Sequence, residues 1–314
     1  MKKQLTFALA ATIAASMGVS ALAADYVNGI EHCFYNYDCY KSTNTVNIDG
    51  VYDAAEWADA ETLVIDNDHM NVAGRWQSAG DPLSAADLSC TYKFKWDDDY
   101  FYLLEVRTDS HYVSNFQGKD YDPNNPWRLD GTALFLCDNE IADQSNRCDI
   151  KWYSYVDELK GPTASVAGVN VNDVSGARMA GSVNGNTIVF ELRLPWSVFD
   201  AEGKLASAIT EGKLFRFTPI IMSRDSIEDY DQWDGSTTSY RQINFHDCMN
   251  LPDENPTSTE DPNFWASITL CGTNPAAVTT SDGTTAAPAT FDAVIVPVAL
   301  ALASFAGIVI SKKH

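Results

Sequence analysis

The aromatic residue best suited to ligand binding is Trp127, which lies shortly before the apolar run 133–136. Pro123 and Pro126 precede it, and each proline disfavours a helical conformation for the residue before it. The pattern therefore predicts a loop that leads into a buried strand. A rigid indole at the rim of a sheet can stack on flat apolar faces, including those of sugar rings. The alternative is that Trp127 folds back over the core, and the residues around it favour neither interpretation.

Acidic residues are abundant and are spread over the loops. The chain has 43 Asp and Glu against 21 Lys and Arg, so its formal net charge is −22. Binding to phosphates needs clustered basic residues, so this composition excludes a nucleic acid as partner. Carboxylate pairs of the glycosidase type arise easily by chance in such a chain, and no G-x-S-x-G, Walker or H-E-x-x-H motif is present. The acids therefore predict a well-solvated surface, with calcium binding as the alternative.

The segments between the loops alternate as short strands do. Two hairpins are expected, one over 88–106 with its turn at 97–99 and one over 177–194 with its turn at 184–186. Further strands are expected at 46–48, 149–156, 213–223, 241–245 and 265–270. Short helical turns are expected at 53–60 and 197–199. The sequence thus predicts an all-β protein, a jelly-roll-like β-sandwich with one or two short helices.

Both ends of the chain have the features of targeting segments. Residues 1–24 combine basic, apolar and small-residue regions in the order of a secretory signal peptide. Residues 293–310 carry no charge and are long enough for a transmembrane helix, and the basic residues of 311–314 predict a cytoplasmic tail. Between them we expect a polar segment at 25–45, a folded module at 46–272 and a stalk rich in Thr, Ala and Pro at 273–292. This organisation predicts a module on the extracellular face of the cell membrane.

The seven cysteines fit an exported chain, in which most thiols are expected to pair. Cys137 and Cys148 flank a short connection that a disulfide could close. Cys33 and Cys39 could close a small loop near the N-terminus. The odd number leaves one thiol free or available to another chain.

Four stretches occur in an order typical of a known family, namely VNIDGVYDAAEW, KFKWDDDYFYLLEVRTD, NPWRLDGTALFLCDNE and NTIVFELRLPWSVF. Together they resemble the family 9 carbohydrate-binding modules, over about 46–270. The resemblance implies a β-sandwich that binds plant polysaccharide or oligosaccharide, often beside calcium. It implies no catalysis by the module itself, although enzymes that degrade polysaccharide could be its partners at the surface.

The resemblance also implies which residues bind sugar. Trp127 matches the stacking tryptophan of the family's P-W-x-x-D element, and Asp130 matches its acidic residue. Ala133 replaces a further acid, and Lys151 stands where an arginine is expected, although an ammonium cannot offer the planar fork of a guanidinium. The second stacking tryptophan has no direct counterpart. Two residues could replace it, Trp233 and Trp265.

A calcium site is the remaining expectation from the resemblance. Calcium takes several oxygen ligands, and the candidate carboxylates are those of Asp49, Asp53, Glu56 and Asp109. The alternative is that Asp53 and Glu56 cap a short helix.

Two other functions remain open at this point. The first is a structural or adhesive surface protein that keeps the sandwich without binding sugar, as the alanine at 133 and the missing second tryptophan suggest. The second is a haem-binding relative that uses His69 and Met70, although neighbouring residues on an extended chain point in opposite directions.

Overall fold

The computed structural model describes residues 25–27, 30–32, 35–66, 75–77, 86–112, 130–157, 161–166, 169–201, 203–226, 240–245 and 261–275. The predicted signal peptide and membrane helix, His69 and Met70 lie outside these ranges. Within the ranges, no helix is both long enough and apolar enough to cross a membrane.

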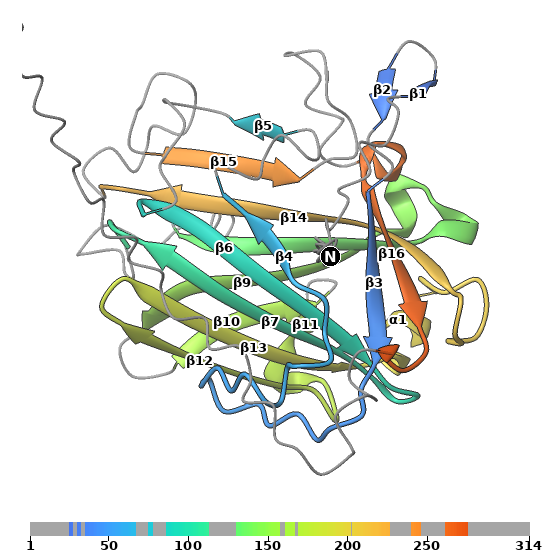
Figure 1. Cartoon of the computed structure of the whole chain (residues 1–314), viewed down its shortest axis with the longest axis horizontal. Helices are drawn as coiled ribbons and strands as arrows, with labels where there is room; N and C mark the ends of the chain where they lie inside the picture. The colour runs from blue at the N-terminus through green and yellow to red at the C-terminus, as the bar shows by residue number, and fades with distance from the viewer. Residues whose placement is uncertain are drawn as a thin grey trace, which may run out of the picture.

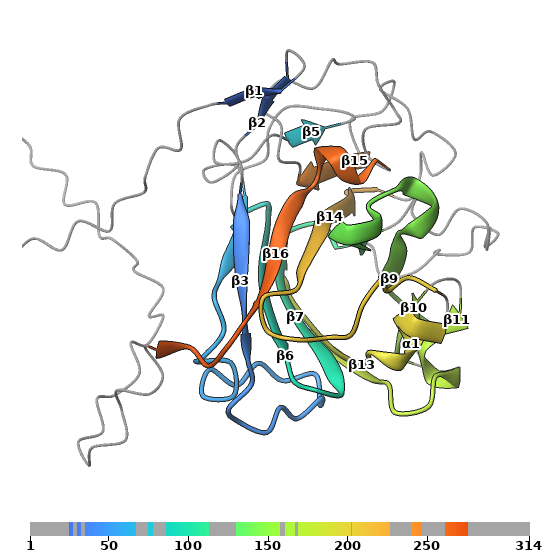
Figure 2. The ribbon, with the colours of Figure 1, turned by 90° about the vertical axis from the view of Figure 1, so that its right-hand side faces the viewer.

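The described chain is mostly β-structure, and most of its strands belong to one 14-stranded sheet that curls round on itself (Figures 1 and 2). We call one part of this sheet the β8 half. Its strands are, in order, β11 (Val169–Asn170), β10 (Gly161–Val166), β9 (Cys148–Asp157), β8 (Gly131–Asp138), β14 (Leu214–Arg224) and β16 (Ala266–Cys271). We call the other part the β7 half. Its strands are, in order, β3 (Asn36–Lys41), β6 (Leu88–Trp96), β7 (Tyr100–Asp109), β13 (Thr187–Pro195) and β12 (Arg178–Asn184).

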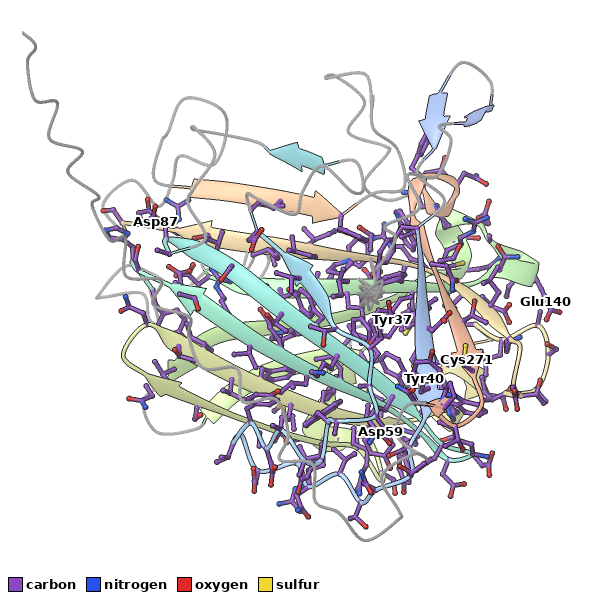
Figure 3. The ribbon with its side chains drawn as sticks, viewed as in Figure 1. Tyr37, Tyr40, Asp59, Asp87, Glu140 and Cys271 are labelled. Atoms are coloured by element: carbon purple, nitrogen blue, oxygen red, sulfur yellow. The ribbon has the colours of Figure 1, made fainter. Side chains whose placement is uncertain are left out.

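The two halves join where β16 and β3 run parallel, and β3 also runs parallel to β6. Tyr40 and Cys271 are Cα partners at this junction (Figure 3). Three short strands extend the sheet at its margins: β15 (Tyr240–Phe245), β5 (Arg75–Gln77) and β4 (Leu63–Ile65). A separate pair is formed by β1 (Asp25–Val27) and β2 (Ile30–His32). A short α-helix, α1 (Ser197–Ala201), follows β13.

The main core lies between the two halves. Every second residue of β6 enters it, from Leu88 to Trp96, and the corresponding residues of β8 and β14 meet them from the other side. Rings dominate this core: Phe94, for example, lies 5.0 Å from Tyr37 and 5.9 Å from Phe217 between centroids. Fully burying a side chain of this size contributes roughly 1.5–3 kcal/mol, so the core is the main source of the sandwich-like arrangement.

Each half also has a buried cluster on its outer face. On the β8 half this outer cluster consists of Ala133, Phe135, Cys137, Ile220, Met222 and Trp265. On the β7 half it consists of Val46, Ile48, Trp57, Ala60, Tyr102 and Leu104. Because both faces are covered, all eight residues of β8 are buried, as the apolar run in the sequence predicts.

The structure confirms both predicted hairpins, which are β6–β7 and β12–β13. The helical turn at 197–199 is confirmed as α1. Two local predictions are wrong. Residues 46–48 form no strand, and 53–60 form turns instead of a helix, because here the side chains of Val46, Ile48 and Trp57 are buried by a segment folded across the sheet.

The predicted disulfide between Cys137 and Cys148 is also wrong. The Cα partner of Cys148 on β8 is Leu136, the residue before Cys137. The Cys148 side chain lies in the main core, whereas the Cys137 side chain lies in the outer cluster. Side chains on opposite faces of a sheet cannot be joined without moving the backbone. Cys39 is buried with a free thiol, while Cys33 lies outside the described residues.

Candidate functional site

Residues around the start of β8 form the described part of the predicted sugar site. Trp127 and Trp233 lie outside the described residues. Asp130, Ala133 and Lys151 are described, and the structure places them on two different faces of the β8 half.

Asp130 lies on the core side, immediately before β8, and its side chain is fully buried. Its Oδ1 accepts a hydrogen bond from Nη2 of Arg107 at 2.8 Å and another from the backbone N–H of Arg224 at 3.0 Å. These bonds join the start of β8 to β7 and to the end of β14. These contacts fix the residue that precedes β8, and a contact between Asp130 and sugar stays a prediction.

Arg107 is the centre of this buried network. Its guanidinium also bonds Asp109 and donates to the carbonyl oxygens of Gly131 at 3.2 Å and Met222 at 2.9 Å. Burial alone would lower the pKa of Arg107, but the charges of Asp109 and Asp130 outweigh it and hold that pKa well above its ordinary value. Arg107 therefore stays charged and ties the two halves of the sheet together at the end where β8 begins.

Glu105 forms a second layer of the network, one step deeper in the core. Its carboxylate accepts hydrogen bonds from Thr132 Oγ1 at 2.8 Å, from the indole N–H of Trp152 and from the Cys90 thiol at 3.5 Å. Burial raises the pKa of Glu105, and the nearby Arg107 charge opposes that rise. The indole of Trp152 stacks on Phe190 with a centroid distance of 5.1 Å, so β9 is locked against β13 at the same place.

The outer face of the β8 half brings together several residues that the resemblance implicates. Ala133 and Lys151 are Cα partners on neighbouring strands, as one shared site requires. The Lys151 ammonium lies 3.0 Å from Asp149 and 5.7 Å from the centroid of the Phe135 ring. Its side chain is 35% exposed, so Lys151 can still reach a ligand from the surface.

Trp265 lies on this face too, 5.8 Å from Phe135 between ring centroids, but it is completely buried. An indole without exposed surface cannot stack on a sugar, so Trp265 acts here as a packing residue. The prediction that it replaces the second stacking tryptophan therefore passes to Trp233.

Arg147 and Asp149 are candidate site residues that the sequence alone did not indicate. The Arg147 guanidinium lies 4.7 Å from the Phe135 ring centroid, and its Nε is 2.8 Å from Oδ1 of Asp149. With Lys151 they form a partly exposed row of charges around Phe135, at every second position from the residue before β9 into that strand. Alternate residues of an extended chain point to the same face, so this spacing could have indicated a shared site. Arg147 supplies a planar guanidinium at this face, which Lys151 cannot supply.

The four proposed calcium ligands do not form one site. Asp49 lies over β13, since its backbone N–H donates to Glu191 at 3.0 Å, and Glu191 is the Cα partner of Leu104. Asp109 is five residues further along β7, about 17 Å at the usual rise of a strand, and it is paired with Arg107.

The other two carboxylates bond to their own segment. Asp53 accepts from the N–H of Ala55 at 2.8 Å, and Glu56 accepts from the N–H of Asn47 at 3.2 Å. No group of three or more metal-binding side chains occurs among the residues that the structure describes. Calcium binding itself stays a prediction.

Comparison with known proteins adds the family context. No curated protein matches this chain. A family 9 carbohydrate-binding module from Caldicellulosiruptor kristjanssonii, in complex with cellotriose, has 15% identity and a TM-score of 0.49, covering 77% of this chain and 96% of its own. A second structure of such a module from the same organism, in complex with glucose, has 16% identity and a TM-score of 0.48, covering 79% and 99%. Residues 48–272 match the family described as carbohydrate family 9 binding domain-like, and the chain therefore belongs to that family.

Proposed function

We propose that this chain is a carbohydrate-binding module that holds oligosaccharide or polysaccharide by stacking on Trp127 and does not itself catalyse a reaction. The observation that carries the proposal is the family match over 48–272, a range that includes Trp127 and the residues of the Arg107 network. Asp130 supports it, because Arg107 and Arg224 hold the chain at Asp130, shortly after Trp127, and a binding residue beside a fixed point loses less entropy on binding. The row Arg147, Asp149 and Lys151 would supply hydrogen bonds to hydroxyl groups.

We propose further that the module is displayed outside the cell. The apolar stretch 293–310 would anchor it, and residues 273–292 would hold it away from the membrane. A non-catalytic module in this position would keep glycans near the surface, where enzymes that degrade polysaccharide could be its partners.

The test is a pair of measurements on the Trp127→Ala protein, which are thermal melting and affinity for cellotriose and xylotriose by calorimetry. Stacking contributes about 0.5–1.5 kcal/mol for aromatic pairs, so we expect binding to weaken roughly two- to tenfold while the melting temperature holds. Trp127→Phe is the matched control, since it keeps a flat apolar ring and should retain most of the affinity.

The opposite result would refute the binding role. If Trp127 packs in the core, Trp127→Ala should cost roughly 3–5 kcal/mol of stability. A large fall in melting temperature would therefore remove Trp127 from the surface site.

A structural or adhesive surface protein with the same fold is the second candidate. The specific observation in its favour is that Asp130, Ala133 and Trp265 are all buried, at 0%, 4% and 0% exposure. Because these three side chains are buried, few of the described site residues are accessible for contact with a sugar. Absence of binding across a glycan array of β-linked glucans and xylans, with intact melting behaviour, would favour this candidate.

A further inference from the structure

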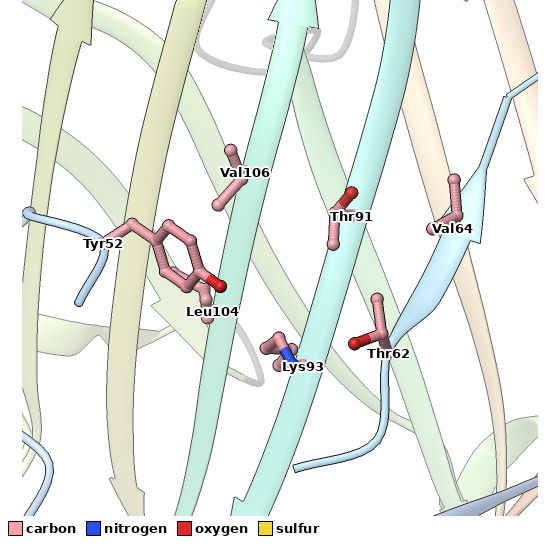
Figure 4. A pocket seen from close by; sticks show the side chains of 7 residues that line it. All are labelled: Tyr52, Thr62, Val64, Thr91, Lys93, Leu104 and Val106. Carbon is pink, nitrogen blue, oxygen red and sulfur yellow. The ribbon is translucent and has the colours of Figure 1, made fainter. Parts of the chain in front are cut away.

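A small cavity lies on the outer face of the β7 half, whereas Lys151 and Arg147 lie on the outer face of the β8 half. Its volume is about 140 Å³. Residues of β4, β6 and β7 form its floor and one wall, and Tyr52 forms the opposite wall (Figure 4). Its lining consists of Tyr52, Thr62, Val64, Thr91, Lys93, Leu104 and Val106. An engineered cavity of about 150 Å³ holds one benzene molecule, so this cavity has room for one six-membered ring.

The polar groups of the cavity gather at one end. The hydroxyl groups of Tyr52 and Thr62 and the ammonium of Lys93 point toward one another, whereas the hydroxyl of Thr91 turns away (Figure 4). A ligand would therefore meet hydrogen-bonding groups along one edge. Elsewhere it would meet the aliphatic side chains of Leu104 and Val106 and the methyl group of Thr91.

Lys93 has hydrogen-bonding capacity to spare. The residue is only 9% exposed, and its ammonium donates two long hydrogen bonds, to the carbonyl oxygens of Trp57 at 3.4 Å and Ala60 at 3.3 Å. An ammonium has three N–H groups, so one remains for a further acceptor. Burial lowers the pKa of Lys93, with partial opposition from the charge of Asp59. An acceptor brought into the cavity would restore part of the solvation that the ammonium has lost.

Tyr52 supplies the flat surface. It is 38% exposed, although the large aromatic side chains in the described part of the chain are mostly buried. Its neighbour Val51 is 62% exposed and does not line the cavity. The Tyr52 ring thus stands at the rim with one part against the cavity and one part toward solvent.

We propose that this cavity is a second carbohydrate subsite, which takes one pyranose ring with its C–H face toward Tyr52 and its hydroxyl edge toward Thr62 and Lys93. A pyranose has both surfaces, an apolar face and an edge of donors and acceptors, and this combination matches the cavity. The choice of sugar as ligand rests on the proposed function of the chain. The subsite lies on the outer face of the β7 half, whereas Lys151 lies on that of the β8 half, so one module would hold two separate points of a glycan.

The test follows the methyl resonances of the full-length chain by NMR during titration with D-glucose, in the wild type and in Trp127→Ala. The subsite predicts shifts of the Thr62, Thr91, Val64 and Val106 methyl groups that saturate in both proteins. Tyr52→Ala should weaken this binding roughly two- to tenfold, as loss of an aromatic contact does. Thr62→Val should also weaken it, because it removes the hydroxyl at nearly unchanged volume.

The matched control is Val51→Ala, which changes an exposed apolar neighbour outside the cavity and should leave the titration unchanged. Saturable methyl shifts that survive Trp127→Ala but weaken in Tyr52→Ala would support the subsite, even if Trp127 proves to have no role in binding. Cavity methyl groups that do not respond to D-glucose would overturn the subsite, and a Trp127-dependent affinity for cellotriose would then leave the proposed function intact. A response that is equal in Tyr52→Ala and the wild type would overturn it as well.

Discussion

Individual buried charges hold the start of β8 in place. Arg107 faces Asp109 and Asp130 with less than 3% of any of the three side chains exposed. Such a group is costly to bury, but removing one member leaves the others uncompensated in a medium that cannot solvate them. The network therefore fixes the position at which β8 begins more than it adds to net stability.

The Arg107→Met protein tests this account. The substitution keeps much of the side-chain volume but leaves two buried carboxylates without their cation, so we expect a loss of about 3–5 kcal/mol in the free energy of unfolding. Urea denaturation provides the measurement. Lys41→Met is the control, since its partner Asp98 is 78% exposed and a surface ion pair contributes about 1 kcal/mol or less. Equal losses in the two proteins would contradict a buried role for Arg107.

A pH dependence is expected from Glu105. Burial raises its pKa above the ordinary value near 4.5, so the folded state holds the proton more tightly than the unfolded state does. The stabilising contribution is complete below that ordinary value and is lost as the pH rises through the raised pKa. The advantage of the wild type over Glu105→Gln in free energy of unfolding should therefore shrink as the pH rises from 4.5 toward neutral and alkaline values.

Denaturation of both proteins across that range measures the effect, because the glutamine does not titrate and other groups cancel in the difference. If the difference in free energy of unfolding stays constant or grows with pH, the pKa of Glu105 is not raised in the folded state.

At the scale of elements, the segment 44–62 depends on one close approach to β12. Gly50 has a φ of 79°, and a Cβ there would lie 2.8 Å from the backbone nitrogen of Gly181. Its N–H donates to Glu191 at 2.8 Å, and its carbonyl oxygen accepts from Ser182 at 2.6 Å. This contact holds segment 44–62 against the sheet. The same segment carries Tyr52 and covers the outer cluster of the β7 half.

Two glycine substitutions should therefore differ. Gly185, in the β12–β13 turn, also has a positive φ, of 58°, but an added Cβ would meet nothing within 4 Å. We expect Gly185→Ala to cost about 1–2 kcal/mol from backbone strain alone. Gly50→Ala should cost about 1–3 kcal/mol more, because the backbone of Gly181 has to move. Thermal melting of both variants decides the matter, and similar melting temperatures would contradict the close packing.

At the scale of the whole molecule, the predicted organisation separates the binding module from its membrane attachment. Deleting residues 293–314 should release a folded protein into the medium, because the stalk separates the sandwich from the apolar stretch. Cell fractionation with the full-length chain as reference makes the comparison. The prediction fails if the truncated protein stays in the membrane fraction and needs detergent for its release.

The sequence by itself determined the class of fold and most of the strands. Alternation from Leu88 to Trp96 and the turn at Asn184, Gly185 and Asn186 are local signals, and the hairpins form where those signals predict. The apolar run of β8 predicted burial on both faces for the same reason. Four ordered motifs were enough to indicate the family that residues 48–272 match.

Only the tertiary structure decided which face each site residue occupies and what it contacts. The sequence contains no local sign that Asp130 pairs with Arg107, because that contact spans 23 residues and joins β7 to the residue before β8. The same holds for Trp265, whose burial depends on the packing of Phe135 from another strand. Cys137 and Cys148 are close in sequence, but the pleat of the sheet directs them to opposite faces. Spacing along a chain limits which residues can meet, whereas the register and curl of the sheet determine which of them do.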